Sequence, residues 1–221
     1  MQHFEISSDI LAQKEKTMQK INFKKRLKNI YNPPANDFTL VNVPSMQFLM
    51  IDGQGDPNKS QDFMDAIQTL YSISYKLKFA SKVNPGKDYT VPPLEGLWWV
   101  DDMKAFTTSD KDSWKWTLMI MQPGWITAEM VEQAKIKAAK KDLRALEKLR
   151  FENFNEGLSV QILYFGSYAD EGPVIAKMHR EWMPANGYQA TGKHHEIYLS
   201  DARKVAPEKL KTILRQPVIK K

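Results

Sequence analysis

The spacing of hydrophobic residues divides the first half of the chain into strands and one helix. Short apolar or alternating runs bounded by Pro and Gly are typical of strands. The strands expected on this basis are residues 40–43, 46–51, 94–101 and 114–122, with a polar turn at 107–112 between the last two. Between Asn58 and Ser81 apolar residues recur every three or four positions, which predicts an amphipathic helix. After the first short strand, the order is therefore strand, helix, strand, strand.

The second half of the chain shows the same kind of alternation. Acidic residues followed by basic ones predict a helix over 127–149. A strand is expected at 158–166, and then a helix over 172–182 that is ended by Asn186-Gly187. Residues 194–200 are expected to form the last strand.

These elements predict an α+β fold with an internal duplication. The segments 48–77 and 160–183 carry the same order of strand, glycine and helix, and each is followed by further strand. Two β-α-β-β modules, about 38–123 and about 157–218, would pair into one sheet about a pseudo-twofold axis. A concave ligand cavity is expected between the two modules.

The first residues, 1–35, are interpreted as an N-terminal arm in front of a single domain of residues 36–221. The arm is rich in Lys and Asn. Phe23, Leu27 and Ile30 have the spacing of a short helix. We expect this helix to dock on the body of the protein without forming part of the core.

Composition places the chain among ordinary globular proteins and excludes several chemistries. The chain has 221 residues, of which 42% are hydrophobic and none is cysteine. Without cysteine there is no disulfide, no thiolate nucleophile and no thiolate-bound metal. Its apolar stretches are far shorter than the roughly 20 residues of a membrane helix, and its N-terminus lacks the order of a secretory signal. A cytoplasmic location without membrane attachment is therefore expected.

The charge distribution and the absence of known motifs argue against nucleic acid, metal and cofactor, so a small molecule is the expected partner. Lys and Arg outnumber Asp and Glu by 32 to 26. The basic residues are concentrated in helical stretches with interspersed acidic residues, which is typical of a solvated face rather than of a nucleic-acid surface. No DNA-binding, dinucleotide-binding or phosphate-loop motif is present, and the four histidines are not spaced to share a metal. No nucleic acid, metal or cofactor is expected.

Aromatic residues are concentrated in the predicted strands and at helix starts. Neighbouring strand residues point to opposite faces, so Trp98 and Trp99 cannot fill the same core, whereas Trp114 and Trp116 share a face. At least one of these indoles is expected to line a cavity. The alternative is that they belong to the core, where tryptophan is often only partly buried.

Two glutamates, Glu95 in PLEGLWW and Glu196 in HHEIYLSD, lie inside apolar or aromatic strand sequence. In the second of these strands His194, Glu196 and Tyr198 share one face, and either face can be the core side. The simplest interpretation of such a glutamate is an exposed side chain. Inside an aromatic cavity it can instead serve as counter-charge for a lipophilic cation or as a general base.

Several strings of the sequence are specific rather than compositional. They are YNPPANDFTLVNVPSMQFLMIDGQGDPN, AIQTLYSISYKLKF, DYTVPPLEGLWW, WKWTLMIMQPGWIT and HHEIYLSDARKVAPEKLKTILRQPV. In these strings the chain resembles the stand-alone GyrI-like (gyrase-inhibitor-like) small-molecule-binding proteins. The similarity extends from about Met18 to Val218, and residues 1–17 lie outside it.

The resemblance implies two modules about a pseudo-dyad, with an aromatic cavity that holds a central glutamate, here Glu196. Family members fused to DNA-binding domains bind lipophilic, often cationic drugs. Some stand-alone members are cyclopropanoid cyclopropyl hydrolases, which use water to open the strained ring of DNA-alkylating natural products and so detoxify them. The resemblance does not choose between this hydrolysis and binding alone. A gyrase-binding protein is a third, less supported alternative.

Combining these residues with the resemblance predicts a site. Glu196 is expected to activate water, and Tyr71 or Tyr198 to position the water or the substrate. The residues expected to bind the ligand are Trp98, Trp99, Trp125, Tyr164, Tyr168 and Met50. Trp98 or Trp99, Trp125 and Tyr164 are expected to share one cavity. The expected ligand is a lipophilic small molecule, either cationic or polycyclic, and the oligomeric state is left open.

Overall fold

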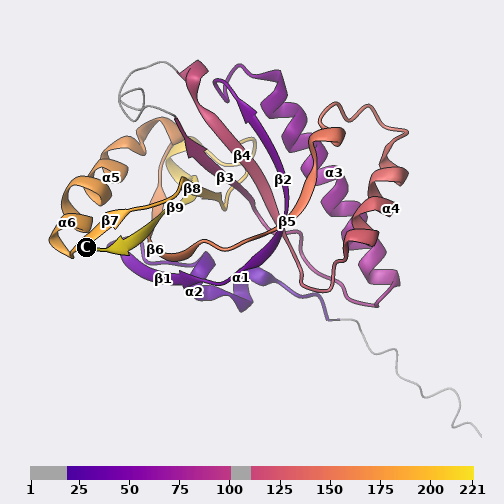
Figure 1. Ribbon diagram of the computed structural model, residues 1–221, viewed down its shortest axis with the longest axis horizontal. Helices are drawn as coiled ribbons and strands as arrows, with labels where there is room; N and C mark the ends of the chain where they lie inside the picture. The colour runs from indigo at the N-terminus through magenta and orange to yellow at the C-terminus, as the bar shows by residue number, and fades with distance from the viewer. Residues whose placement is uncertain (1–18, 101–110) are drawn as a thin grey trace, which may run out of the picture.

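One large antiparallel sheet organises the part of the chain that the computed structural model describes, residues 19–100 and 111–221 (Figure 1). Its strand order is β1-β6-β9-β8-β3-β4-β2-β5, and β7 pairs with β9. The strands are β1 (Thr39–Val43), β2 (Met46–Gln54), β3 (Leu94–Trp99), β4 (Lys115–Gln122), β5 (Arg150–Phe154), β6 (Gly157–Phe165), β7 (Tyr188–Ala190), β8 (His194–Tyr198) and β9 (Lys211–Lys220). The predicted combination of helices and a sheet is confirmed. Residues 1–17 and most of the expected turn at 107–112 lie outside the described residues.

The larger helices lie at two ends of the sheet (Figure 1). The helices are α1 (Phe23–Arg26), α2 (Lys28–Tyr31), α3 (Gln61–Val83), α4 (Ala128–Ala138), α5 (Gly172–Lys177) and α6 (Met183–Ala185), with a π-helical turn between α5 and α6. At one end α3 packs against α4, β2 and β4, and at the other α6 contacts β7. Among the described helices, none combines the length and the hydrophobicity needed to cross a membrane.

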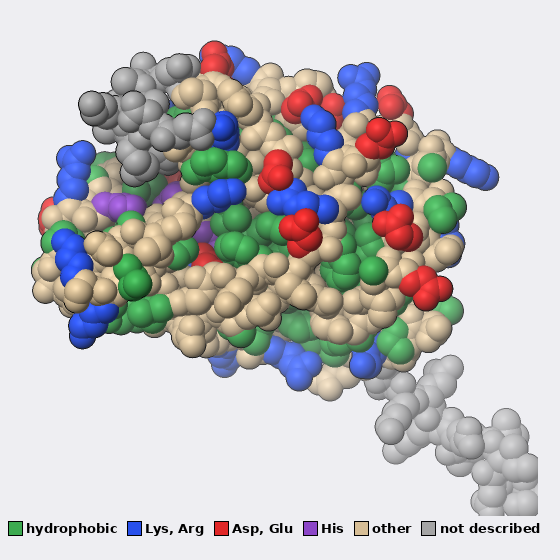
Figure 2. All heavy atoms as spheres, in the orientation of Figure 1, with side chains coloured by type: hydrophobic (Ala, Val, Ile, Leu, Met, Phe, Trp, Pro, Cys, Tyr) green, Lys and Arg blue, Asp and Glu red, His purple; other side chains and the backbone are tan. Residues whose placement is uncertain are grey.

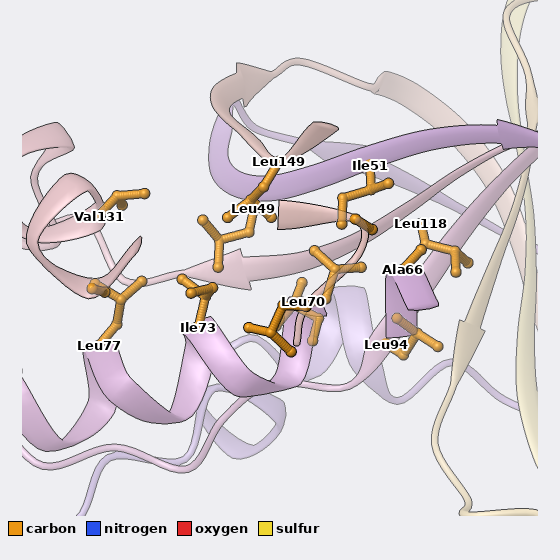
Figure 3. Packing of buried hydrophobic residues seen from close by; sticks show 14 of the residues in the cluster. Leu49, Ile51, Ala66, Leu70, Ile73, Leu77, Leu94, Leu118, Val131 and Leu149 are labelled. Atoms are coloured by element: carbon orange, nitrogen blue, oxygen red, sulfur yellow. The ribbon is translucent and has the colours of Figure 1, made fainter. Parts of the chain in front are cut away.

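The apolar stripe of α3 forms the main core with β2 and β4. Leu70, Ile73 and Leu77 are fully buried, and Figure 3 shows Ile73 beneath Leu49 of β2 and Leu77 beneath Val131 of α4. Burying each such leucine contributes about 1.5–3 kcal/mol. The helix begins at Gln61 because the Ser60 hydroxyl accepts a hydrogen bond from the backbone N–H of Phe63. The helix predicted between Asn58 and Ser81 is thus confirmed.

The helix predicted over 127–149 ends early. Thr127 caps its start, but α4 ends at Ala138. A helix continued to Leu149 would carry the chain about 16 Å further along its axis. Instead the apolar residues that follow turn back, and Leu149 is buried in the same core cluster as α3. Burial in the core therefore outweighs the helix-forming composition of this segment.

Three strands, β5, β7 and β9, were not predicted. β5 pairs with β2, and β9 rather than residues 194–200 is the last strand. Within β9 lie Arg215, Gln216 and Pro217, which are unusual in the interior of a sheet. The strand nevertheless lies between β6 and β8, because the structure pairs the charge of Arg215 inside the protein.

Part of the N-terminal arm belongs to the core. The docking predicted from Phe23, Leu27 and Ile30 is confirmed, with two short helices in place of one. The expectation that the arm stays outside the core is wrong for Ile30 and Tyr31, which are only 2% exposed. They pack with Ile197 of β8, because α2 covers a sheet face that would otherwise expose apolar side chains.

A cluster of four charged side chains lies beneath α2. His195 Nδ1 is 2.8 Å from Glu156 Oε1, and its Nε2 is 3.0 Å from Glu95 Oε2. Arg215 Nη1 donates to Glu156 Oε2 at 3.0 Å, and the Tyr31 hydroxyl donates to Glu95 Oε1 at 2.8 Å. Each charged side chain is at most 1% exposed. Two carboxylates and two cations compensate one another, which makes their burial tolerable.

The cluster determines the charge of its members. Burial by itself lowers the pKa of His195, but the carboxylates of Glu156 and Glu95 raise it to about 9. Burial likewise raises the pKa of Glu156, but His195 and Arg215 lower it to about 2. Because each imidazole nitrogen faces a carboxylate, the doubly protonated ring is the form that fits this position.

We expect the free energy of unfolding to fall as the pH rises from about 6.5 to about 9. The pKa of His195 is about 9 in the folded protein and about 6.5 in the unfolded chain. Its stabilising effect, on the order of 3 kcal/mol, is therefore complete below about pH 6.5 and is lost as the pH rises through the folded value.

Urea denaturation across this pH range checks the expectation. His195→Gln should flatten the decline, whereas His179→Gln should retain it, because burial and His194 lower the pKa of His179 to about 4. An equally steep decline in both variants would assign the effect to other groups.

The close approach of β2 and β4 depends on Gly53. The ring of its cross-strand partner Trp116 occupies the space that a side chain at Gly53 would need. Gly53→Ala should displace this fully buried tryptophan and lower the free energy of unfolding by about 1–3 kcal/mol. Gly124→Ala is the matched control, because no atom lies within 4 Å of the added methyl. Equal urea midpoints for the two variants would contradict this account.

Candidate functional site

A cleft of about 2280 Å³ opens between α3 and α5, above β3 and β8. Phe63 and Tyr71 of α3 form one wall, Ile175 of α5 lies in the other, and Trp98 and Tyr198 belong to the floor. Histidine side chains, purple in Figure 2, are visible in the hollow at the left of the face shown. The volume exceeds the roughly 300–1,000 Å³ of a typical small-molecule pocket, so a polycyclic ligand fits.

Alternation along β8 decides which of its side chains reach the cleft. His194, Glu196 and Tyr198 line it. His195 and Ile197 point to the opposite face, into the charge cluster and the core beneath α2. One face of the strand is therefore buried beneath α2, and the other is open to a ligand.

A chain of hydrogen bonds holds Glu196 in the floor of the cleft. Trp98 Nε1 donates to the Tyr198 hydroxyl at 3.0 Å, and this hydroxyl donates to Glu196 Oε2 at 2.8 Å. Burial and the charge of Glu196 raise the pKa of Tyr198 well above its ordinary value, so the phenol keeps its proton. Glu196 Oε1 lies 3.6 Å from His194 Nε2, and the Glu196 side chain is 15% exposed. One carboxylate oxygen is thus fixed and the other can meet a ligand or water.

A second carboxyl group, that of Glu171, faces the same cleft from the start of α5. Burial and the charge of Glu196 raise the pKa of Glu171 to about 9, outweighing the opposite effect of Thr212. The carboxyl of Glu171 is therefore neutral at pH 7. Within residues 19–100 and 111–221, no cluster of three or more His, Asp or Glu side chains is arranged to hold a metal ion.

Residues 36–219 match the family model of the GyrI-like small molecule binding domain. The chain belongs to the GyrI-like family. An uncharacterized conserved protein from Listeria innocua is 41% identical, with a TM-score of 0.83, over 90% of this chain and 100% of that chain. A hydrolase from Listeria innocua is 40% identical, with a TM-score of 0.79, over the same shares of the two chains.

A more distant structure shares the fold of this GyrI-like protein. The EcmrR C-terminal domain is 15% identical, with a TM-score of 0.52, over 84% of this chain and 98% of that domain. At this identity the likeness concerns the fold alone. No curated protein matches the chain at a significant level.

Most of the predicted site residues of this GyrI-like protein line the cleft. They are Glu196, Tyr71, Tyr198, Trp98, Trp99 and Tyr168. Tyr168 packs edge-on against Tyr198, with ring centroids 5.5 Å apart. Tyr71 stacks on Tyr75 of the same α3 wall. Trp99 lies under the ammonium group of Lys193, whose Nζ is 3.2 Å from the ring centroid.

The structure does not bring Trp125, Tyr164 and Met50 to the lining of the cleft. Trp125 donates a hydrogen bond to the Ser81 hydroxyl at 2.8 Å, at the C-terminal end of α3. Met50 is buried in a separate apolar cluster on the other face of β2, and Tyr164 packs against a third cluster beside α5. The single cavity expected for the aromatic residues is therefore corrected, because these side chains pack in or against separate clusters.

Two glutamates differ from what the sequence indicated. Glu95 is fully buried rather than exposed, because the register of β3 points it at His195 and Tyr31. Glu171 was not singled out. Its one sequence signal is its place directly before Gly172-Pro173, where a predicted helix begins after a strand.

We expect Gly96→Ala to weaken ligand binding. A methyl group at this position would lie 2.9 Å from Trp98 Nε1 and 3.1 Å from the Tyr198 hydroxyl, and so would disrupt their hydrogen bond. Losing one such bond costs about 1 kcal/mol, or about fivefold in affinity. Titration of tryptophan fluorescence with a neutral polycyclic dye measures the effect, with Gly124→Ala as the unaffected control. Unchanged affinity in Gly96→Ala would mean that this hydrogen bond does not shape the cleft.

Proposed function

We propose that this protein binds lipophilic, polycyclic small molecules in its cleft and hydrolyses the cyclopropane ring of DNA-alkylating toxins, which detoxifies them. The observation that carries the proposal is the Glu196 carboxylate, held by Tyr198 inside an aromatic cleft. Membership of the GyrI-like family supports the binding of small molecules. The 40% identical hydrolase from Listeria innocua supports hydrolytic chemistry.

In this proposal Glu196 is the general base. Tyr198 holds Oε2 at 2.8 Å, so Oε1 accepts the proton of a water molecule as the water oxygen attacks a ring carbon. Release of ring strain favours cleavage of the carbon–carbon bond, whose electron pair moves to an acceptor group of the substrate that then takes up a proton. The protein then contributes the positioning of the reactants and general-base catalysis, which accelerates the reaction by about 10²–10⁴-fold. No cofactor enters the proposed step.

The aromatic walls hold the substrate against this base. Trp98, Trp99 and Tyr168 offer flat apolar surface to a polycyclic ring system. Tyr71 positions the substrate or the water from the α3 wall. Burial and the neighbouring Tyr75 raise the pKa of Tyr71, so its hydroxyl remains a hydrogen-bond donor.

A non-catalytic protein that binds or senses lipophilic cations is the second candidate. It is favoured by the Glu196 carboxylate, which lies among aromatic rings. Each aromatic face contributes about 0.5–2 kcal/mol to the binding of a cation. In this case the same cleft binds the cation and does not convert it chemically.

The strand order supports the proposal that two copies of one β-α-β-β module build the sheet. β2, α3, β3 and β4 pair in the order β2-β4-β3, and β6, α5, β8 and β9 pair in the order β6-β9-β8. These equivalent orders meet at the β3–β8 pair, below the cleft. We propose that the protein acts in the cytoplasm, without a nucleic-acid or membrane partner.

Glu196→Gln tests the proposed function. The amide keeps the size of the carboxylate but cannot accept the proton, so turnover of a cyclopropane substrate should fall at least about 10²-fold. Affinity for a neutral polycyclic dye should be retained. Mass spectrometry of the small molecule detects the added water, and the exposed Glu208→Gln serves as control.

Other results separate the alternatives. An unchanged small molecule in the presence of the wild-type protein, combined with weaker binding of a cationic dye by Glu196→Gln, identifies a binding protein. A Glu196→Gln variant equal to wild type in turnover and in affinity for both dyes would remove Glu196 from the site.

A further inference from the structure

Glu171 is a buried carboxyl group to which the proposed hydrolysis assigns no part. It lies between β6 and α5, is only 3% exposed and lines the cleft. Its Oε1 atom makes no hydrogen bond to any of the described residues. Buried polar atoms usually have partners, so an unpaired one beside an open cleft indicates a place where a ligand supplies the partner.

The surroundings of Glu171 favour its protonated form. The titratable groups that face it are Glu196 and Tyr198 of β8, Tyr164 of β6 and Tyr168 of the turn that precedes it. None of these groups is a cation that would stabilise a second carboxylate. Burial and the charge of Glu196 raise the pKa of Glu171 to about 9, so it carries a proton at neutral pH.

Opening a cyclopropane with water is assisted by an acid as well as by a base. When water attacks a ring carbon, the electron pair of the broken carbon–carbon bond must move to an acceptor group. In a cyclopropane conjugated to a carbonyl, the acceptor is the carbonyl oxygen, which gains negative charge and then a proton. Enzymes often provide an acid and a base in one site with two carboxyl groups. Their different environments give them different pKa values, so that one is protonated and the other is ionised.

We propose that Glu171 is the catalytic acid that protonates this carbonyl oxygen, while Glu196 deprotonates the attacking water. This inference rests on the proposed hydrolase function. The water oxygen bonds to a ring carbon, the carbon–carbon bond breaks, and its electron pair passes through the conjugated system to the oxygen. Glu196 gains one proton and Glu171 loses one, so the substrate gains one water. Exchange with solvent through the open cleft restores both carboxyl groups.

Glu171→Gln is the central test, because the amide preserves the shape and a hydrogen-bond donor but cannot transfer a proton. Turnover of the conjugated substrate should fall by about 10²–10⁴-fold. The melting temperature and the affinity for a neutral dye should match those of the wild type, which shows that the cleft is intact. Glu171→Asp retains an acid and should restore part of the rate, and the exposed Glu208→Gln should equal the wild type.

The pH profile distinguishes an acid from a structural role. In the wild type kcat/KM should decrease above about pH 9, about tenfold per pH unit, and Glu171→Gln should lack this decrease. A variant that keeps wild-type turnover, or that keeps the decrease, overturns the proposal. In the second case the decrease belongs to His195, whose pKa is also about 9.

Failure of this inference and failure of the proposed function give different results. A wild-type protein that turns over no cyclopropane refutes the hydrolase function, and the role of Glu171 with it. An inactive Glu196→Gln beside a fully active Glu171→Gln refutes the acid role of Glu171 alone.

Discussion

The antiparallel pairing of β3 with β8 is the constraint on which both the charge cluster and the cleft depend. Side chains alternate along each strand, so the pair presents Glu95 and His195 to the face covered by α2. The same pairing presents Trp98 and Glu196 to the cleft. A slip of one residue would exchange the two sets. The charge cluster would then lose its partners, and the cleft would lose its floor.

The two faces of this strand pair handle charge in different ways. Beneath α2, His195 and Arg215 compensate two carboxylates, so the charges are stable although no solvent reaches them. In the cleft, the charge of Glu196 acts on Glu171, which holds its proton instead. A cluster in which opposite charges compensate one another is typical of structural support. Two neighbouring carboxyl groups in a cleft, one of them with a raised pKa, are typical of a functional site. The proposed binding and the proposed hydrolysis use the same walls and differ only in whether these protons move.

Hydrophobic spacing determined most elements of the fold, because the period of a strand or a helix is a property of neighbouring residues. It indicated β2, α3, β3 and β4 in the right order. It did not reveal β9, since the charge of Arg215 is acceptable in a central strand because of Glu156, which is 59 residues away. It also extended α4 too far, because Leu149 reaches the core by turning back and not by helical continuation.

The same division holds for the site. Alternation alone indicated that Glu196 and Tyr198 share a face, and the structure joins them by a hydrogen bond. No local pattern indicated that Trp125 packs against the core at the C-terminal end of α3 or that Glu95 is fully buried. The proton on Glu171 depends on Glu196, which comes from another strand. Spacing along the chain thus determined which side chains lie together on one element, whereas tertiary packing decided which of them are buried beside one another, and burial sets their charge.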